Sequence, residues 1–596
     1  MPDVSAKNFC APWARLPYHS RVEKTAAAMI EKAPTGIDGL DDITYGGLPR
    51  GRVSLLAGGA GSGKTIFGFQ TLVNGARTYG EPGVFVTFEE HSSRIVKNLG
   101  GFGWGLPALL SRKIAIIDAK LDPDLVVSGK FDICGILAQM AAQVKNLGAR
   151  RIVLDSVDTP LSLMDNPSDW RRELYRLHEW LLAEGLTAIV TAKSRMPWEG
   201  GMLLEPFAFL EYLADCSISL NREIVDGVSQ RHLRVQKYRG SMFSENQTPF
   251  VIGEQGMAVA GVRGGARLKT KVSLARLSSG IARLDTMLGG GFFRAACVLI
   301  TGSPGTAKTT LGGLFAAAAC ERGEKTMIFS FDSRPDEIMR NLTSVSIPLR
   351  PYVRKGVLRI ESTRAGGSSA DACLVQIMSL ARRHGIRNLV VDPISSLGKQ
   401  GNAGTAYGVV ERLSDWAKTE GITLFCTSLL DGALENTEST LLRISTIADT
   451  WIHLSYLVRG GERNRALTIV KSRGTKHSNQ VRELVLSEDG VTLEDVYTAG
   501  GEVLMGTLRW EREQAMALEQ KRHRAQWLQN TKRLDAEESE LTIRMKAIEQ
   551  QFANLRAQRE GLAEEERAHE QSQYSMRKDL AKRRAGDDSR LPGHED

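Results

Sequence analysis

The stretch VSLLAGGAGSGKT, residues 53–65, joins an apolar run to a cluster of glycines that ends in a lysine and a threonine. Residues 58–65 match GxxxxGK[ST], the pattern of a phosphate-binding loop between a strand and a helix. Glycines let backbone N–H groups surround phosphate oxygens, while the lysine can reach the β- and γ-phosphates. The residues predicted to bind the nucleotide are Gly58, Gly61, Ser62, Gly63, Lys64 and Thr65. A loop without function is the alternative.

The same pattern occurs a second time. Residues 35–65 return, with changes, at 278–309, and IVLDS and KYRGS are answered in order by LVVDP and KSRGT. Apolar runs such as VSLLAG, GVFVTF, RIVLD and TAIVTA read as buried parallel strands separated by amphipathic helices, so each copy predicts a doubly wound α/β domain. The expected organisation is an N-terminal extension at 1–33, domains at 34–260 and 277–504, and a linker at 261–276.

The second phosphate loop differs from the first at one position. Alanine replaces its last glycine, and this methyl group could tilt the loop, although the lysine and threonine remain. We still expect a nucleotide there, with a vestigial pocket as the alternative. The residues predicted to bind it are Gly302, Gly305, Thr306, Ala307, Lys308 and Thr309.

Carboxylates follow the strands of both copies. Asp155 and Asp392 each end a hydrophobic strand, where a carboxylate can hold Mg²⁺ with the help of the loop hydroxyl of Thr65 or Thr309. The alternative is that each aspartate caps the next helix.

A second pair of matched positions carries the candidate catalytic bases. Glu89 and Glu90 follow another strand of the first copy, and Asp332 and Ser333 occupy the matching positions of the second. A carboxylate there can orient and deprotonate a nucleophile. The first copy is thus predicted to hydrolyse the nucleotide, whereas the shorter Asp332 predicts lower efficiency or none. A solvated strand end is the alternative.

Each copy also contains a K-x-R-G stretch far in sequence from its own phosphate loop. Lys237 with Arg239, and Lys471 with Arg473, suit a cationic finger that reaches the nucleotide of a neighbouring subunit. The alternative is an exposed hairpin that carries basic residues.

The composition is that of a globular protein. Hydrophobic residues make up 42% and charged residues 24%, and no apolar run is long enough to span a membrane. The first residues lack the apolar segment of a secretory signal, so we expect a cytoplasmic protein that does not contact a membrane. The seven cysteines form no CxxC pair and are predicted to be buried thiols. A net charge of +8 does not argue for nucleic-acid binding.

The C-terminal segment has a different pattern. In a background of charged residues, apolar residues recur at heptad positions: Leu534, Leu541, Met545, Ile548, Phe552, Leu555 and Leu562. We predict one helix at 505–583 that forms a self-associating coiled coil, followed by a disordered tail at 584–596. Glu538, Arg559 and Glu566 fall on the same seam and weaken or specify the pairing. A single charged helix or a docking arm for another protein is the alternative.

Together these motifs resemble the KaiC family of double-domain, RecA-like P-loop ATPases. The resemblance covers roughly residues 35–509 and rests on both phosphate loops and on FVTFEE, IVLDS, SSGIARLD, GGGFF, KYRG, KSRGTKH and RISTIADT. It implies two tandem RecA-like domains that assemble into stacked hexameric rings, with ATP and Mg²⁺ between subunits. It also implies slow ATP hydrolysis in the first ring and autophosphorylation in the second.

The resemblance assigns the phosphate acceptors and identifies two departures. Ser445 and Thr446 match the family's autophosphorylated pair, and Thr440 matches a further threonine. Strand-edge residues with useful hydroxyls are the alternative. Asp332 and Ser333 stand where the family's second ring has tandem glutamates, which leaves Asp332 as the candidate kinase base. The heptad segment replaces the tail that binds KaiA, so KaiA dependence is not expected, while pairing of two hexamers into a dodecamer and a KaiB-like partner stay open.

Two other functions compete with this hypothesis. A RecA-type motor on DNA would need a basic channel with aromatic residues, which the loops do not provide. A non-kinase scaffold would bind ATP in the second domain only to hold the assembly together, while the coiled coil recruits another protein.

Overall fold

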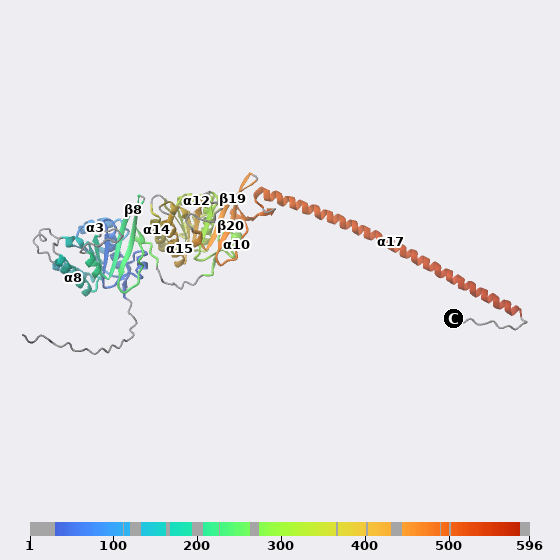
Figure 1. Ribbon diagram of the computed structural model, residues 1–596, viewed down its shortest axis with the longest axis horizontal. Coiled ribbons are helices and arrows are strands. Elements are labelled where there is room, and N and C mark those ends of the chain that lie inside the picture. Colours follow the sequence, from blue (N-terminus) through green and yellow to red (C-terminus); the bar gives the residue numbers. More distant parts are fainter. Residues whose placement is uncertain are drawn as a thin grey trace, which may run out of the picture. The chain divides into compact units, whose positions relative to one another are not determined.

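The computed structural model describes most of the chain (Figure 1): residues 30–110, 112–119, 133–162, 167–193, 207–225, 227–262, 273–364, 368–400, 403–430, 444–459, 461–488, 490–499 and 502–584. The chain divides into two compact units, Met1–Asp495 and Val496–Asp596. Thr440, most of the expected N-terminal extension, linker residues 263–272 and nearly all of the expected disordered tail lie outside the described residues.

The first unit contains two nine-stranded sheets of the same topology. In spatial order, the first sheet consists of β11 (Gly256–Val259), β10 (Thr248–Gly253), β9 (Val228–Tyr238), β8 (Cys216–Val225), β3 (Val53–Gly58), β7 (Thr187–Lys193), β6 (Arg151–Asp155), β4 (Gly83–Thr87) and β5 (Ile114–Asp118). The second consists of β22 (Gly490–Asp495), β21 (Arg482–Ser487), β20 (Glu462–Ser472), β19 (Thr450–Arg459), β14 (Cys297–Gly302), β18 (Thr423–Leu429), β17 (Asn388–Asp392), β15 (Thr326–Ser330) and β16 (Leu358–Ser362). The matched order confirms the predicted repetition of one RecA-like fold.

Parallel and antiparallel pairing divide each sheet. In the first sheet, β8, β3, β7, β6, β4 and β5 are parallel, whereas β9, β10 and β11 pair antiparallel. The second sheet repeats this division. The predicted parallel strands are therefore confirmed, and the antiparallel extension adds to them.

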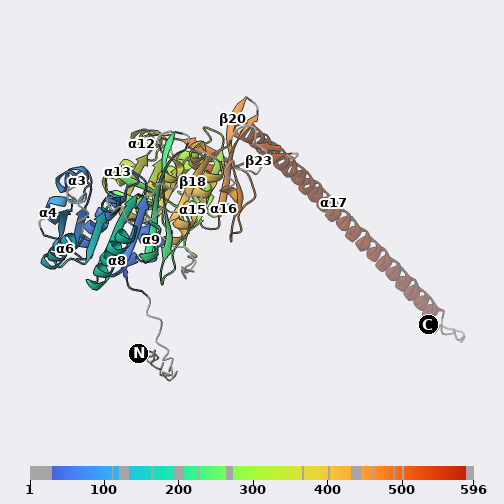
Figure 2. The ribbon, with the colours of Figure 1, turned by 60° about the vertical axis from the view of Figure 1, so that its left-hand side comes forward.

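Helices cover both faces of the first sheet because its central strands are apolar on both sides. Leu56 and Val153 belong to the core on one face of the sheet, while Leu55 and Leu154 belong to the core on the other. One face carries α2 (Lys64–Thr78), α3 (Ser92–Leu99) and α4 (Leu106–Leu110), and the other carries α6 (Cys134–Leu147), α8 (Pro167–Ala183) and α9 (Phe207–Leu213). Figure 2 shows α8 and α9 beside the strands of this sheet.

The second sheet is covered in the same way. Phe315 of α11 (Lys308–Glu321) and Leu342 of α12 (Pro335–Thr343) pack on one face. Trp416, fully buried, lies on the other face. The elements of this other face are α14 (Ala370–His384), the 3₁₀ helix η1 (Ile394–Gln400) and α15 (Ala403–Thr419).

Shorter elements complete the fold. In the first copy these are β1 (Lys32–Ala33), α1 (Leu40–Ile43), β2 (Leu48–Pro49) and α7 (Asp158–Ser162). In the second copy they are β12 (Arg276–Leu277), α10 (Ala282–Met287), β13 (Phe292–Phe293), α13 (Arg350–Arg354) and α16 (Ile444–Ile447). The thiols of known environment are buried, as predicted: Cys216, Cys297, Cys320, Cys373 and Cys426.

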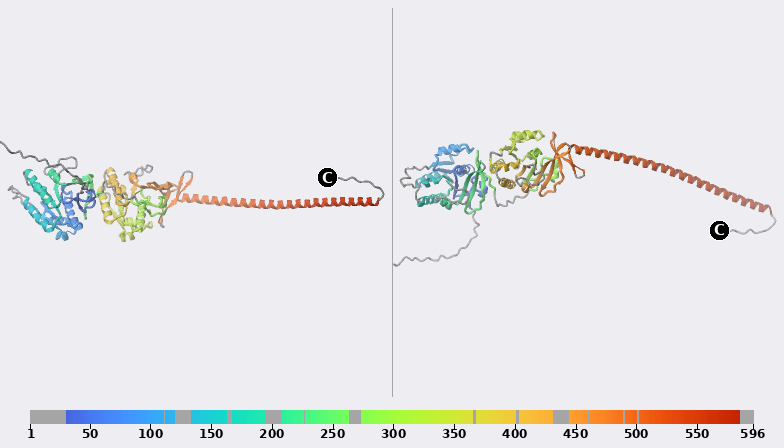
Figure 3. Two further views of the ribbon diagram at one scale, coloured as in Figure 1. Left: turned by 90° about the horizontal axis from the view of Figure 1, so that it is seen from below. Right: turned by 45° about the horizontal axis from the view of Figure 1, so that its top comes forward.

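The second unit is dominated by one helix, α17 (Gly506–Arg583), which follows the hairpin β23 (Tyr497–Ala499) and β24 (Glu502–Leu504). It has 78 residues and no buried residue, and it runs without interruption in both views of Figure 3. Its heptad residues are exposed, for example Leu541 at 65% and Phe552 at 63%. The predicted helix is confirmed, whereas its pairing stays a prediction. Among all the described helices, none combines the length and apolar character needed to cross a membrane.

Candidate nucleotide sites

The first phosphate loop connects β3 to α2 and depends on glycine. Gly61 and Gly63 have φ values of +68° and +103°, in the left-handed region where side chains are disfavoured. A Cβ atom at Gly63 would also lie 2.8 Å from the Ile252 Cδ1 atom. The sequence of the loop is thus required by its path into the helix.

Lys64 lies at the start of α2 with its ammonium group against the loop. Its Nζ atom donates hydrogen bonds to the carbonyl oxygens of Gly58, at 2.8 Å, and Gly59, at 3.0 Å. Burial lowers the pKa of Lys64, and the carboxylates of Asp155 and Asp158 act in the opposite direction. A buried ammonium group that is held mainly by carbonyl dipoles would gain from phosphate charge, so this loop fits a nucleotide.

The hydroxyl of Thr65 and the carboxylate of Asp155 meet beside Lys64. Thr65 Oγ1 donates a hydrogen bond to Asp155 Oδ2 at 2.7 Å, and Thr191 donates one to the other carboxylate oxygen. Burial raises the pKa of Asp155 despite these hydrogen bonds. A divalent cation would offset this cost of charge, and a carboxylate with a hydroxyl suits the oxygen preference of Mg²⁺.

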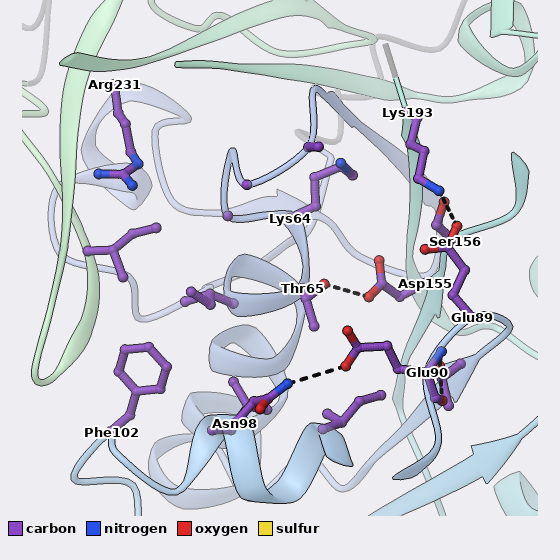
Figure 4. Close-up of a pocket in the computed structure, with 18 residues that line it drawn as sticks. Lys64, Thr65, Glu89, Glu90, Asn98, Phe102, Asp155, Ser156, Lys193 and Arg231 are labelled. Carbon is purple, nitrogen blue, oxygen red and sulfur yellow. Dashed lines mark hydrogen bonds and ion pairs between the residues drawn. The ribbon is translucent and has the colours of Figure 1, made fainter. Parts of the chain in front are cut away.

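The two candidate bases follow β4 and point into the same pocket (Figure 4). Glu89 accepts a hydrogen bond from Thr159 Oγ1 at 2.7 Å and forms an ion pair with Lys193. Burial works against the charge of Glu89, but the Lys193 and Thr159 contacts outweigh it and lower the pKa of Glu89. Glu90 lies near Asn98, whose Nδ2 atom is 3.4 Å from the Glu90 carboxylate.

These residues line a pocket of about 720 Å³, within the usual range for small-molecule sites. In Figure 4, Glu89 and Lys193 lie on one side of the phosphate loop, and Phe102 and Arg231 lie on the other. The larger apolar residues of the pocket are Ile66, Ile95, Leu99, Phe102 and Ile252. The pocket thus offers both charged groups for phosphates and an apolar surface for a base.

The second phosphate loop keeps this arrangement. Lys308 Nζ donates to the carbonyl oxygens of Gly302 and Ser303, each at 2.8 Å, and burial lowers the pKa of Lys308 to about 8. Thr309 Oγ1 donates to Asp392 Oδ2 at 2.7 Å. Burial raises the pKa of Asp392. The site therefore suits phosphate and a divalent cation for the same reasons as the first.

Ala307 adopts the backbone conformation of the glycine that it replaces. Its φ of +76° matches the left-handed conformation of Gly63 at the start of α2. A non-glycine residue in this region costs about 1–2 kcal/mol. The loop therefore carries strain, but the contacts of Lys308 show that it is not displaced.

Asp332 has a poorer set of partners than Glu89. Its Oδ1 atom lies 3.4 Å from Ser396 Oγ, and among the described contacts no lysine or arginine pairs with it. Ser333 uses its backbone N–H to bond Ser330 Oγ at 3.1 Å. Within the described residues, Asp332 thus lacks a cation like the one that Lys193 places beside Glu89.

The K-x-R-G residues do not join their own phosphate loops. Lys237 pairs with Ser217 on β8, and Ser217 pairs with Leu55 on β3, three residues before the loop begins at Gly58. Arg239 lies still farther along: its N–H bonds the Asp215 carbonyl, and the Asp215 N–H bonds the Val53 carbonyl. These cations therefore lie at the edge of the sheet opposite the loop.

Three of these cations, Lys237, Arg239 and Arg473, contact the segment that precedes β8 or β19. Lys237 Nζ and Arg239 Nη2 donate to the Tyr212 carbonyl at 3.2 and 2.7 Å. Arg473 Nη2 donates to the Thr446 carbonyl at 2.8 Å and its Nη1 atom lies 3.7 Å from Asp449 Oδ1. Lys471, which pairs with Trp451 on β19, follows the same register.

The predicted phosphate acceptors lie on α16. Thr446 is exposed, and α16 precedes β19, whose Thr450 pairs with Val298 near the start of β14. Thr446 is therefore also remote from its own loop at Gly302. The backbone of Ser445 lies in α16, but its side chain lies outside the described part of the structure, as does Thr440.

Four further residues line the pocket of the first copy and were not predicted from the sequence: Lys193, Asn98, Phe102 and Arg231. Lys193 ends TAIVTAK, the strand beside the phosphate-loop strand. Since ligands lie at the carboxyl ends of parallel strands, its position was a usable signal. The other three come from a helix, a loop and an antiparallel strand, where the sequence gives no comparable sign.

Comparison with known proteins shows a family match in each of the two copies. A family model described as "ATPase: KaiC" matches residues 33–262 and 277–496. The chain is 38% identical over 561 residues to "Circadian clock protein KaiC2" of Synechocystis sp., covering 93% of this chain and 97% of that protein. It is 34% identical over 496 residues to "Circadian clock oscillator protein KaiC" of Thermosynechococcus vestitus, covering 83% of this chain and 95% of that protein. The family match ends at residue 496, but the alignment with the Synechocystis protein covers 93% of this chain, so that alignment must extend into the C-terminal unit.

Proposed function

Since this chain belongs to the KaiC family of ATPases, we propose that it works as a hexamer in which each subunit completes the nucleotide sites of its neighbour. The first ring hydrolyses ATP slowly. The second ring binds ATP and transfers phosphate to Ser445 and Thr446, which gives the assembly a signalling or timing state. ATP and Mg²⁺ are required at both sites.

The observation that carries this proposal is the placement of the cations and acceptors. Arg239 and Arg473 lie at the sheet edge opposite their own phosphate loops, about 16 Å away at the rise of a strand. A guanidinium group stabilises transferred phosphate only in direct contact. An arginine in this position that acts on a nucleotide can therefore reach only one that another subunit holds.

The residues of the first site divide the work of hydrolysis. Lys64 and the loop N–H groups hold the phosphates, while Thr65 and Asp155 would hold Mg²⁺, which would supply charge to neutralise the phosphates. Glu89 takes a proton from water as the water oxygen bonds to the γ-phosphorus. The bond between that phosphorus and the bridging oxygen breaks, which releases ADP and phosphate. The apolar side of the pocket, with Phe102, suits the adenine ring.

In the second site, the acceptor hydroxyl of a neighbouring subunit takes the place of water. Lys308 holds the phosphates, Thr309 and Asp392 would hold the cation, and Asp332 takes the hydroxyl proton. Thr446 is exposed on its subunit, as an acceptor must be before it enters another subunit's site.

Mixed assemblies test the shared site. Arg239→Ala keeps an intact loop, and a variant in which Glu89 and Glu90 are both glutamine keeps an intact arginine, so each alone should lose first-ring turnover. In a random equal mixture, about a quarter of the interfaces pair the intact loop and glutamates of the first variant with the intact arginine of the second. We expect ATP turnover of the mixture to exceed that of both parents, measured by phosphate release. A mixture no more active than the mean of its parents would contradict the shared site.

We also propose that α17 pairs with copies of itself and can join two hexamers into a dodecamer. Its exposed apolar seam would be buried in a coiled coil, which is the arrangement that heptads favour. A KaiB-like protein that binds the first ring remains a candidate partner, whereas KaiA dependence is not part of the proposal.

Replacement of two seam residues tests this pairing. With Leu541→Gln and Ile548→Gln, light scattering with Mg-ATP should show a mass of one hexamer instead of two, because two buried layers are lost. The control replaces Ala547 and Ala557, which lie off the seam on the same helix, by glutamine. ATP turnover should be unchanged in both. A seam variant with the mass of the unaltered chain would rule out the paired assembly.

A non-kinase scaffold is the second candidate, and the poor environment of Asp332 favours it. In that case the second ring binds ATP and holds the assembly without transferring phosphate. A DNA motor is a weaker alternative, which salt-dependent retention on single-stranded DNA would revive.

A further inference from the structure

Lys193 occupies a position with direct access to the first site. It ends β7, which pairs with β3 so that Lys193 is opposite Gly58, the first residue of the phosphate loop. Its Nζ atom forms the ion pair with Glu89 and lies 3.7 Å from Asp158 Oδ2. The backbone N–H of Lys193 bonds Asp158 Oδ1 at 3.0 Å, which fixes the end of the strand.

The second copy lacks this cation. Leu429 ends β18 and is opposite Gly302, in the same register as Lys193 with Gly58. Its backbone N–H bonds the hydroxyl of Ser395 at 3.1 Å, so the strand end is fixed as in the first copy. The two copies therefore share a backbone arrangement and differ in the charge that faces the candidate base.

Folding stability does not account for the Lys193–Glu89 pair. The two side chains are 50% and 35% exposed, and ion pairs at this exposure contribute little to stability. The pair also holds Glu89 at the edge of the pocket, where the carboxylate has a chemical use.

We propose that Lys193 is a positioning residue, which holds Glu89 where its carboxylate can take a proton from the attacking water. In this way Lys193 adapts the first copy, but not the second, to hydrolysis. This inference rests on the proposed function of the first site. A base must be ionised before it accepts the proton of water, and a cation next to a carboxylate favours the ionised form. The contact of Lys193 lowers the pKa of Glu89 in the same sense.

Other charged groups surround Glu89, but they pull in both directions. Lys64 favours its ionisation from α2, while Asp155 and Glu90 add negative charge from β6 and the β4 end. Asp158, on α7, instead competes for Lys193. Lys193 is the cation that contacts Glu89 directly among the described residues.

Replacement of Lys193 by leucine, the residue of the second copy, tests the proposal in the full chain. We expect kcat for first-ring hydrolysis to fall roughly tenfold or more, because Glu89 loses the contact that positions it. KM should stay within about twofold, since the loop still binds the phosphates. The acid limb of the kcat profile should move to higher pH, since Glu89 without its cation is protonated more easily. Lys193→Arg should restore most of the rate. Lys145→Leu, an exposed lysine on α6, is the matched control for charge.

The melting temperature separates positioning from folding and should change by no more than about 2 °C in Lys193→Leu. An unchanged kcat, or a lower kcat with an unmoved acid limb, would overturn the proposal. If Lys193→Leu does not fold, Lys193→Gln should show the same pH shift, and its absence would be equally decisive.

Turnover that remains with Glu89→Gln and Glu90→Gln is subtracted to isolate the first ring. If that double variant hydrolyses ATP at the normal rate, the proposed function of this site fails. If it is inactive but Lys193→Leu is normal, only the inference about Lys193 fails.

Discussion

Replacement of Glu89 and Glu90 together by glutamine should lower ATP hydrolysis in the first ring by about 10²–10⁴-fold, the usual contribution of a general base. Glutamine keeps the size and polarity of the side chain but cannot accept the proton of water. Nucleotide binding should persist because the phosphate loop and Asp155 are unchanged. The measurement is single-turnover phosphate release beside binding of a fluorescent ATP analogue.

A matched double variant controls for lost charge. Glu179 and Glu184 are exposed at the end of α8 and after it, away from the pocket. Their replacement by glutamine should leave turnover within about twofold. Normal hydrolysis by the first double variant, with an intact hexamer, would remove both glutamates from the mechanism. If the double variant does lose hydrolysis, single variants identify the base. Glu89→Gln should have the larger effect, because Glu89 carries the Lys193 contact.

The second large effect concerns the proposed phosphate acceptors of the second domain. After incubation with Mg-ATP, intact mass should increase by one or two phosphates per chain, and this increase should vanish when Ser445 and Thr446 are both alanine. Asp332→Asn should slow the transfer by about 10²-fold or more, because the amide cannot take the hydroxyl proton. Peptide mapping by mass spectrometry locates the phosphate.

Asp336→Asn is the control for Asp332→Asn, since Asp336 is exposed in the first turn of α12. It should leave the transfer rate unchanged. An unmodified chain that forms hexamers and hydrolyses ATP, yet takes up no phosphate, would contradict the kinase hypothesis and favour the scaffold. Phosphate on other residues would reject the assignment of Ser445 and Thr446 alone.

Sequence patterns predicted those parts of the fold that depend on local physical rules. The run VSLLAG became β3 and RIVLD became β6 because strands buried on both faces need continuous apolar residues. The phosphate loops were recognisable because left-handed backbone positions demand glycine. Ala307 shows that the rule is a preference, since it takes the same conformation at a cost.

The rest depended on pairing between distant strands. The position of Arg239 at the far edge of the sheet follows from the antiparallel register of β8 and β9, which no local pattern states. The contrast of Lys193 with Leu429 likewise emerges only when both strands are aligned against their phosphate loops. The side chains at the apolar side of the pocket come from separate elements, so their convergence had no signal in the sequence.

The separation of loop and arginine on opposite edges of one sheet gives the subunit a polarity. An interface that joins unlike edges repeats head to tail, and such a series either closes on itself or grows into an open filament. If subunits join in this way, as proposed, the curvature between neighbouring sheets decides the copy number, and a substitution that flattens it would produce fibres from subunits that still fold and bind ATP.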